Sequence, residues 1–322
     1  MSKKSDIITQ PKPIVPKKRK KDRRGAVDNI TMFFMTFPTM LYIFIFSYVP
    51  MFGLILAFKD YKFSDGIFGS AWVGLNNFVF YFTSQDAFRT TYNTVFMNFL
   101  FIVIGISAAV ICALLLFEIT QRALIKTYQT IMILPSYLSW VVVAYMVYAL
   151  LHPQYGLVNQ IVTSMGGEIV DWYSAPNWWP FIMTFAVVWK NLGLDTVMYY
   201  AGLMGVSSDY YEAAAIDGAN KLQQTWYISI PFLVPLITVL TTLRIGNIFR
   251  ADFGMFFAVT KNSGPLYPTM DVIDTYVFRA LRQLGDTGMS AAVGLYQSLV
   301  GFVLILVTNW IVNKIEPDNA LF

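Results

Sequence analysis

Six long apolar runs constrain the fold of this 322-residue chain more than any other feature. A transmembrane helix needs roughly 20 apolar residues to cross a hydrocarbon core about 30 Å thick, and each run reaches that length. The runs are continuously apolar, whereas strands of a membrane β-barrel alternate in polarity. We therefore predict an all-α integral membrane protein with about six transmembrane helices, near residues 31–57, 91–117, 129–151, 179–203, 228–250 and 289–312.

The composition agrees with this class and excludes several kinds of chemistry. Charged residues make up 13% of the chain, against about 25% in soluble proteins. A single cysteine, Cys112, excludes an intrachain disulfide and a cysteine-based metal site. The sequence has no P-loop, HExxH, GxSxG or CxxC motif. We expect no catalytic residue, metal site or bound cofactor on this chain.

The basic residues predict the orientation and the domain boundaries. Residues 1–30 hold ten of the 23 Lys and Arg residues, and the KKRKKDRR stretch at 17–24 directly precedes the first span. Such a stretch occurs in nucleic-acid-binding segments, but before a span it is better explained as a cytoplasmic anchor on anionic membrane lipid. We predict both termini in the cytoplasm and no nucleic-acid partner. The predicted parts are a basic tail (1–30), a first helix with an external loop (31–90), a five-helix core (91–312) and a C-terminal tail (313–322).

The most polar stretch between the later spans lies within the predicted cytoplasmic loop 204–227. Glu212, Ala213 and Ala214 favour a helix, and Gly218 supplies a position without a Cβ atom. A short helix with a mostly small face is suited to docking in a groove of another protein. An ordinary connecting loop with one helical turn is the alternative explanation.

Three short motifs of this region resemble the EAA loop of the membrane subunits of binding-protein-dependent ABC importers. They are Glu212-Ala213-Ala214, Asp217-Gly218-Ala219 and Ile230-Pro231. The resemblance implies the permease fold of type I importers, with a cytoplasmic coupling helix that contacts an ATPase. The coupling residues would be Glu212, Ala213, Ala214, Asp217, Gly218 and Ala219.

The same resemblance implies partners and a location. The expected partners are a second homologous permease, two ATP-binding subunits that hold ATP and Mg, and an extracytoplasmic solute-binding protein. The expected location is the bacterial cytoplasmic (inner) membrane. Residues 48–61 and 70–78 resemble the branch that imports complex polysaccharides. This favours oligosaccharides over a monosaccharide and leaves open that they are acidic.

Polar residues inside spans are costly in lipid and are functional hypotheses by default. Lys190 and Asp195 are five positions apart, so an irregular turn at Gly193 would be needed to bring them together. An internal polar contact without a role in transport is the alternative. The candidates for the translocation path are Asn98, Lys190, Asn191, Asp195, Arg244 and Asn247.

Arg244, Asn247 and Arg250 recur at intervals of three on the predicted fifth span. They could bind an anionic sugar such as a uronate, or extend toward the outer interface; the second explanation is favoured. Residues 251–288 are expected to form a long polar loop, and its acidic residues, among them Asp252, Asp271 and Asp274, are expected to be solvated. A secondary transporter and a membrane transferase are the rival hypotheses. The first would usually show inverted repeats, and the sequence shows none.

Overall fold

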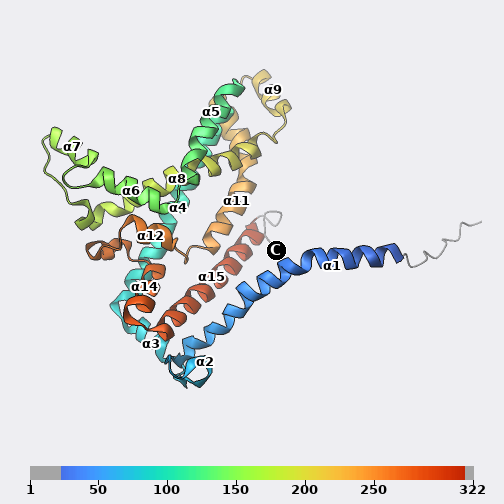
Figure 1. The fold of residues 1–322 in the computed structure, drawn as a ribbon. Helices are drawn as coiled ribbons and strands as arrows, with labels where there is room; N and C mark the ends of the chain where they lie inside the picture. Colours follow the sequence, from blue (N-terminus) through green and yellow to red (C-terminus); the bar gives the residue numbers. More distant parts are fainter. Residues whose placement is uncertain (1–22, 316–322) are drawn as a thin grey trace, which may run out of the picture. The chain divides into compact units, whose positions relative to one another are not determined.

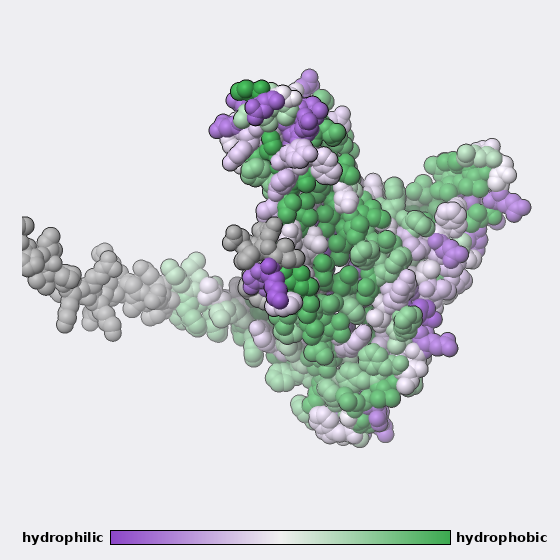
Figure 2. All heavy atoms as spheres, turned by 180° about the vertical axis from the view of Figure 1, so that it is seen from behind, coloured by the Kyte–Doolittle hydropathy of each residue, from purple (hydrophilic) through white to green (hydrophobic). Residues whose placement is uncertain are grey.

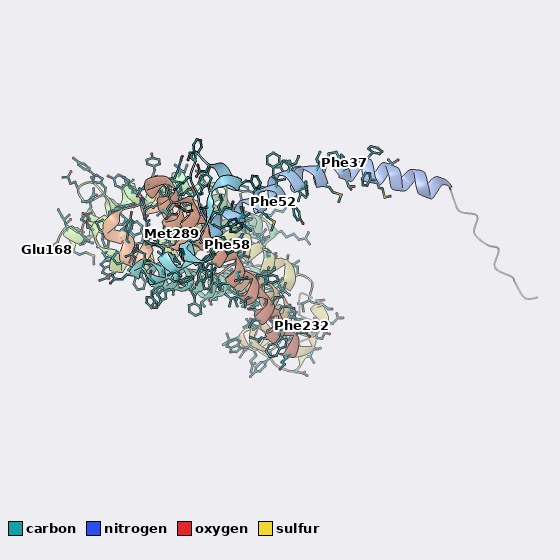
Figure 3. All side chains as sticks on the ribbon, turned by 90° about the horizontal axis from the view of Figure 1, so that it is seen from below. Phe37, Phe52, Phe58, Glu168, Phe232 and Met289 are labelled. Atoms are coloured by element: carbon teal, nitrogen blue, oxygen red, sulfur yellow. The ribbon has the colours of Figure 1, made fainter. Side chains whose placement is uncertain are left out.

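The computed structural model describes residues 23–315, which divide between Gly53 and Leu54 into two units. The first unit consists of α1 (Arg23–Ile43), a π-helical turn at Phe44–Tyr48 and the beginning of a 3-10 helix at Val49–Phe58. Figure 3 shows Phe37 projecting from α1 and Phe52 from the 3-10 helix, and both side chains are exposed. Most of the predicted basic tail, residues 1–22, and the last seven residues lie outside the described part.

Long helices form the frame of the second unit. They are α4 (Gln85–Phe117), α8 (Trp179–Leu203), α11 (Ile230–Gly246) and α15 (Thr287–Ile315). Together with residues 31–58, the described part has five helical segments long and apolar enough to cross a membrane, and a bent pair makes a sixth. The prediction of an all-α membrane protein with about six spans is confirmed. Figure 2 shows a broad hydrophobic surface along these helices, with hydrophilic residues gathered near α9.

The third span is not the single helix predicted at 129–151. It consists of α5 (Arg122–Ile133) with a 3-10 turn at Leu134–Tyr137, followed by α6 (Trp140–Leu151), and the two parts meet at 97°. Leu138 and Ser139 are extended between them, and the Ser139 hydroxyl accepts a hydrogen bond from the Val142 N–H at 3.3 Å. This N-cap starts a new helix in a new direction.

The fifth span also differs from its predicted limits of 228 and 250. It begins with α10 (Lys221–Gln224) and a π-helical turn at Thr225–Ser229, and α11 ends at Gly246. The candidate residues Asn247 and Arg250 therefore lie beyond the helix, in the turn that follows it.

Residues 251–288 are not the solvated polar loop that we predicted. They contain α12 (Phe253–Val259), α13 (Tyr267–Met270), α14 (Ile273–Arg279), a 3-10 turn at Gly264–Leu266 and a π-helical turn at Ala280–Leu284. Phe256, Leu266 and Ile273 are fully buried. The segment folds back on the long helices, with α12 beside α6 and α14 beside α4 (Figure 1).

The remaining elements connect the spans. A two-stranded antiparallel hairpin pairs β1 (Lys59–Asp60) with β2 (Ala71–Trp72) around α2 (Gly66–Gly69), and α3 (Asn76–Thr83) follows. The Lys59 ammonium is buried and donates to the carbonyls of Ile67 and Phe68 at 2.9 Å. Further on are α7 (Leu157–Ser164), two 3-10 turns at Trp172–Ser174 and Pro176–Trp178, and α9 (Ser208–Ile216). Glu168, exposed between α7 and the first of these turns, lies at the outer edge in Figure 3.

Among the described residues of the second unit, three buried clusters hold the helices together. The largest joins α4, α6, α8 and α12 and includes Met97, Trp179, Met183 and Phe256. The second packs Tyr81 and Met289 against α14, and the third joins α4, α8 and α11 through Ala109, Tyr199 and Leu233. The small residues Ala109 and Ala113 let α4 approach α8 closely, as small residues do between membrane helices.

Candidate functional site

The motif residues of the predicted coupling loop form a short helix with a fixed end. α9 begins at Ser208, and its C-terminus is closed by hydrogen bonds from the N–H of Gly218 to the Ala215 carbonyl at 3.1 Å and from the N–H of Ala219 to the Ala214 carbonyl at 2.8 Å. This is a Schellman motif, which needs a left-handed residue after the helix. Gly218 has φ +82°, and a Cβ built there would meet no atom within 4 Å. The glycine is therefore required by its backbone conformation, and not by crowding within this chain.

α9 is anchored on one side and exposed on the other. The Tyr211 hydroxyl lies 3.0 Å from the Ser229 hydroxyl, and its ring packs against Phe117. Glu212, Ala213 and Asp217 are exposed, and the Ile216 side chain is 87% exposed. Figure 1 shows α9 at the end of α5 and α11 that lies away from α3 and α14. The arrangement leaves an accessible helix surface at one end of the spans.

A polar pocket lies between α4, α8 and the end of α11. Its volume is about 460 Å³, within the range of small-molecule sites. Five of the six predicted path residues line it, and Arg250 does so as well. The lining residues are Asn98, Phe101, Ile102, Asn191, Asp195, Leu240, Leu243, Arg244, Asn247 and Arg250.

The charges of the pocket do not cancel. Arg244 Nη2 donates to Asp195 Oδ1 at 2.6 Å, which joins α11 to α8. Arg250 is exposed and forms no ion pair within residues 23–315. Among the side chains that line the pocket, two guanidinium groups against one carboxylate give one net positive charge. The explanation that Arg244, Asn247 and Arg250 extend toward the outer interface stays a prediction, and the Arg244 guanidinium is directed at Asp195 in the pocket.

Asn98 fixes one wall of the pocket. Its Nδ2 donates to the carbonyl oxygens of Ile248 at 2.9 Å and Arg250 at 3.2 Å. The asparagine on α4 thus holds the turn after α11 and sets the position of the Arg250 backbone. Asn247 Nδ2 donates back to the Leu243 carbonyl at 3.0 Å.

Lys190 lies apart from the other five candidates. Its ammonium is buried, donates to the Ser136 carbonyl at 2.7 Å and lies 5.4 Å from the centre of the Trp140 ring. It therefore secures α8 to the bend between α5 and α6. The predicted irregular turn at Gly193 is absent from α8, which is α-helical throughout. Gly193 instead allows α5 to touch α8, since an added Cβ would overlap the Met132 carbonyl.

The structure contains a buried ionic cluster that the sequence did not predict. The Asp271 carboxylate, expected to be solvated, is fully enclosed and pairs with Arg279 at 2.7 Å and Arg89 at 3.0 Å. Asn93 Nδ2 also donates to the Asp271 carbonyl at 3.1 Å. These contacts fasten the segment 251–286 to the start of α4. Arg89 and Asn93 lie 182 and 178 positions from Asp271, so no local pattern could have revealed their contacts with it.

Asp274 is the second carboxylate for which the expectation of solvation is wrong. It accepts hydrogen bonds from the Ala251 N–H at 2.8 Å and from Gln297 Nε2 at 2.9 Å. Burial raises the pKa of the Asp274 carboxyl above its ordinary value, and these hydrogen bonds and the charge of Arg250 only partly oppose that effect.

Comparison with known proteins identifies the family. The binding-protein-dependent transport system inner membrane component family matches residues 101–317, two thirds of the chain. This chain belongs to that family. The polygalacturonan/rhamnogalacturonan transport system permease protein YteP of Bacillus subtilis (strain 168) is 32% identical over 94% of each chain.

Solved structures agree with the fold of this family member. A chain of a bacterial ABC transporter involved in the import of the acidic polysaccharide alginate superposes with a TM-score of 0.83 at 30% identity, over 91% of this chain and 99% of the other. A bacterial alginate ABC transporter in complex with an alginate-pentasaccharide-bound periplasmic protein gives a TM-score of 0.82 at 30% identity, over 92% and 98%. The predicted resemblance to ABC importer permeases is confirmed.

Proposed function

We propose that this chain is the permease subunit of an ATP-driven importer for acidic oligosaccharides released from polysaccharides. The observation that carries the proposal is the pocket between α4, α8 and α11, with its net positive charge. Asn191 and Asn247 offer amide groups for sugar hydroxyls, Asn98 offers its side-chain oxygen because its Nδ2 is engaged by backbone carbonyls, and Arg250 is available for a carboxylate. The similarity to permeases for galacturonan and alginate supports the same substrate class.

We further propose that α9 couples the pocket to ATP hydrolysis in partner subunits. The exposed side of α9, with Glu212 and Ile216, would sit in a groove of an ATPase in the cytoplasm. A second homologous permease, two ATPases that hold ATP and Mg, and an extracytoplasmic binding protein would complete the importer in the cytoplasmic membrane. Alternating access then follows if ATP binding favours the outward-open state and hydrolysis restores the inward-open one.

The experiment that tests the assembly is purification of the tagged chain from its native membrane, followed by mass spectrometry. We expect a second permease and an ATPase to accompany the wild-type chain. Glu212→Lys reverses a charge on the exposed side of α9 and should release the ATPase. Asp65→Lys, an equal charge reversal at an exposed external residue, serves as the control and should retain it.

A second measurement tests the pocket. The purified complex in proteoliposomes should take up tetragalacturonate, and Arg250→Gln should slow that uptake about tenfold, as expected for one charge-assisted hydrogen bond. Uptake of the carboxyl-reduced, neutral tetrasaccharide should be the same in the wild type and in the Arg250→Gln variant. If the chain is recovered alone and moves solute without ATP, the importer proposal fails and a secondary transporter takes its place.

A further inference from the structure

A second pocket, separate from the one described above, opens between α6 and α12. Its volume is about 450 Å³, and three aromatic rings and one cation line it. Tyr145 and Tyr148 come from α6, Phe257 from α12, and Lys261 from the turn that follows α12. None of these residues belongs to the pocket of Arg244 and Asp195.

Lys261 is a cation without a counter-ion. Its ammonium lies 3.6 Å from the centre of the Tyr148 ring, and it forms no ion pair within the described residues. The negative face of an aromatic ring attracts a cation but does not neutralise it. The site therefore retains a full positive charge beside exposed aromatic surface, with Tyr145 72% exposed.

The backbone holds Lys261 in place by an unusual turn. Lys261 and Asn262 have φ values of 56° and 48°, and they are the two described residues other than glycine with positive φ. Most side chains with a Cβ avoid this region and asparagine tolerates it best, so the strain falls on Lys261; strained conformations persist where the surroundings enforce them, often at functional sites. Here the Asn262 side-chain oxygen accepts from Arg279 and from the Tyr267 hydroxyl, both at 3.3 Å.

We infer that Tyr145, Tyr148, Phe257 and Lys261 form a second saccharide subsite, which takes a carboxylate-bearing sugar unit of the same chain that enters the first pocket. The apolar C–H face of the sugar ring would pack on Tyr145, and the carboxylate would pair with Lys261. Charge complementarity selects this occupant over a neutral sugar. The inference rests on the proposed function, because it assumes that oligosaccharides pass through this chain.

One hydrogen bond joins two chain segments that adjoin the two pockets. Arg250 borders the first, and two residues later Asp252 Oδ2 accepts a hydrogen bond from Trp140 Nε1 at 2.7 Å. Trp140 begins α6, whose next residue, Val141, borders the second pocket. An oligosaccharide that occupies both sites would thus have one cation at each end, Arg250 and Lys261. A disaccharide would need only the first site.

The test uses the complete importer in proteoliposomes and compares the uptake of digalacturonate and tetragalacturonate. Lys261→Met keeps an unbranched side chain one heavy atom shorter and removes its charge. We expect a loss of about tenfold in the apparent affinity for the tetrasaccharide and less than a twofold change for the disaccharide. Tyr145→Ala should act in the same direction, whereas Tyr145→Phe should restore wild-type behaviour, because Tyr145 contributes its ring and not its hydroxyl.

The controls separate this inference from the proposed function. Lys62→Met removes an exposed cation elsewhere in the external loops, paired with Asp60 at 4.0 Å, and should change neither substrate. Equal losses for both substrates, or no loss for either, would overturn the subsite while leaving the importer intact. A Lys261→Met effect that appears only with anionic lipid in the vesicles would assign the site to a lipid phosphate. Loss of the second permease when the Lys261→Met variant is purified would assign the site to a subunit interface. If wild-type vesicles take up neither substrate, the proposed function itself fails.

Discussion

At the scale of single residues, backbone conformation decides the role of Gly218. Its left-handed φ closes α9, and the space around it is open. The free-energy penalty of a substitution should therefore follow the conformational cost of placing the new residue in the left-handed region, about 1–2 kcal/mol for an ordinary residue. It should not follow the volume of the side chain. Asparagine tolerates this region better than other residues do, and β-branched residues tolerate it worst.

We expect uptake to fall in the order Gly218→Asn, Gly218→Ala, Gly218→Val, with the asparagine variant nearest to wild type. Transport assays on the three variants at equal membrane abundance check this order. If alanine outperforms asparagine, volume at a partner interface governs the position, and the conformational argument is wrong.

The ion pair of Asp195 and Arg244 is also a residue-scale feature. The Arg244 side chain is about one third exposed, so removing one partner should cost less than the roughly 3–5 kcal/mol of a fully buried pair. Arg244→Gln and Asp195→Asn should each lower the thermal stability of the purified chain, and the double variant should recover most of the loss. Melting temperatures of the four forms test this coupling. Purely additive losses would show that the contact contributes no stability of its own.

At the scale of elements, the contact between α5 and α8 depends on Gly193. A side chain there would strike backbone atoms of Met132 and Ile133, which cannot move aside as a flexible side chain can. Gly193→Ala should separate the two helices and destabilise the protein by about 3 kcal/mol, the upper end of the usual cost of overpacking, because the clash is with backbone. Gly294→Ala on α15 is the matched control, since no atom lies within 4 Å of its added Cβ.

Thermal unfolding in detergent compares the two alanine variants. The Gly294 variant should match wild type or exceed it slightly, because alanine favours helices. Similar melting temperatures for both variants would contradict the close contact of α5 and α8.

At the scale of the whole molecule, the buried Asp274 links global stability to pH. Its folded pKa is raised above the ordinary value of about 3.9. Between the two values the folded state binds more protons than the unfolded state, so stability decreases as pH rises through this window. Asp274→Asn should weaken this decrease, since the amide oxygen can still accept the Ala251 N–H.

Melting temperatures measured at intervals from pH 4 to pH 7 check the dependence. The decline of the wild-type protein should exceed that of Asp274→Asn, whereas Asp65→Asn, at an exposed carboxylate, should follow the wild type. Parallel curves for all three proteins would rule out Asp274 as the source.

The sequence by itself determined the class, the number of spans and the motif helix. Long apolar runs cannot be stable in water and have few alternatives in a membrane, so local composition suffices for them. It also pointed to Asn98, Asn191, Asp195, Arg244 and Asn247, because each is a polar residue in or next to an apolar span. The sequence did not predict that these five residues line one pocket, because that depends on how α4, α8 and α11 pack.

Only the tertiary structure decided which polar groups meet. Lys190 and Asp195 are close in sequence, yet Lys190 pairs with a carbonyl at the bend and Asp195 with Arg244, 49 residues away. Asp271 looked like a loop carboxylate, and it is buried because arginines from α4 and α14 converge on it. Long-range ion pairs and the 97° bend depend on how helices pack, and packing follows from contacts between distant segments, which a local pattern does not record.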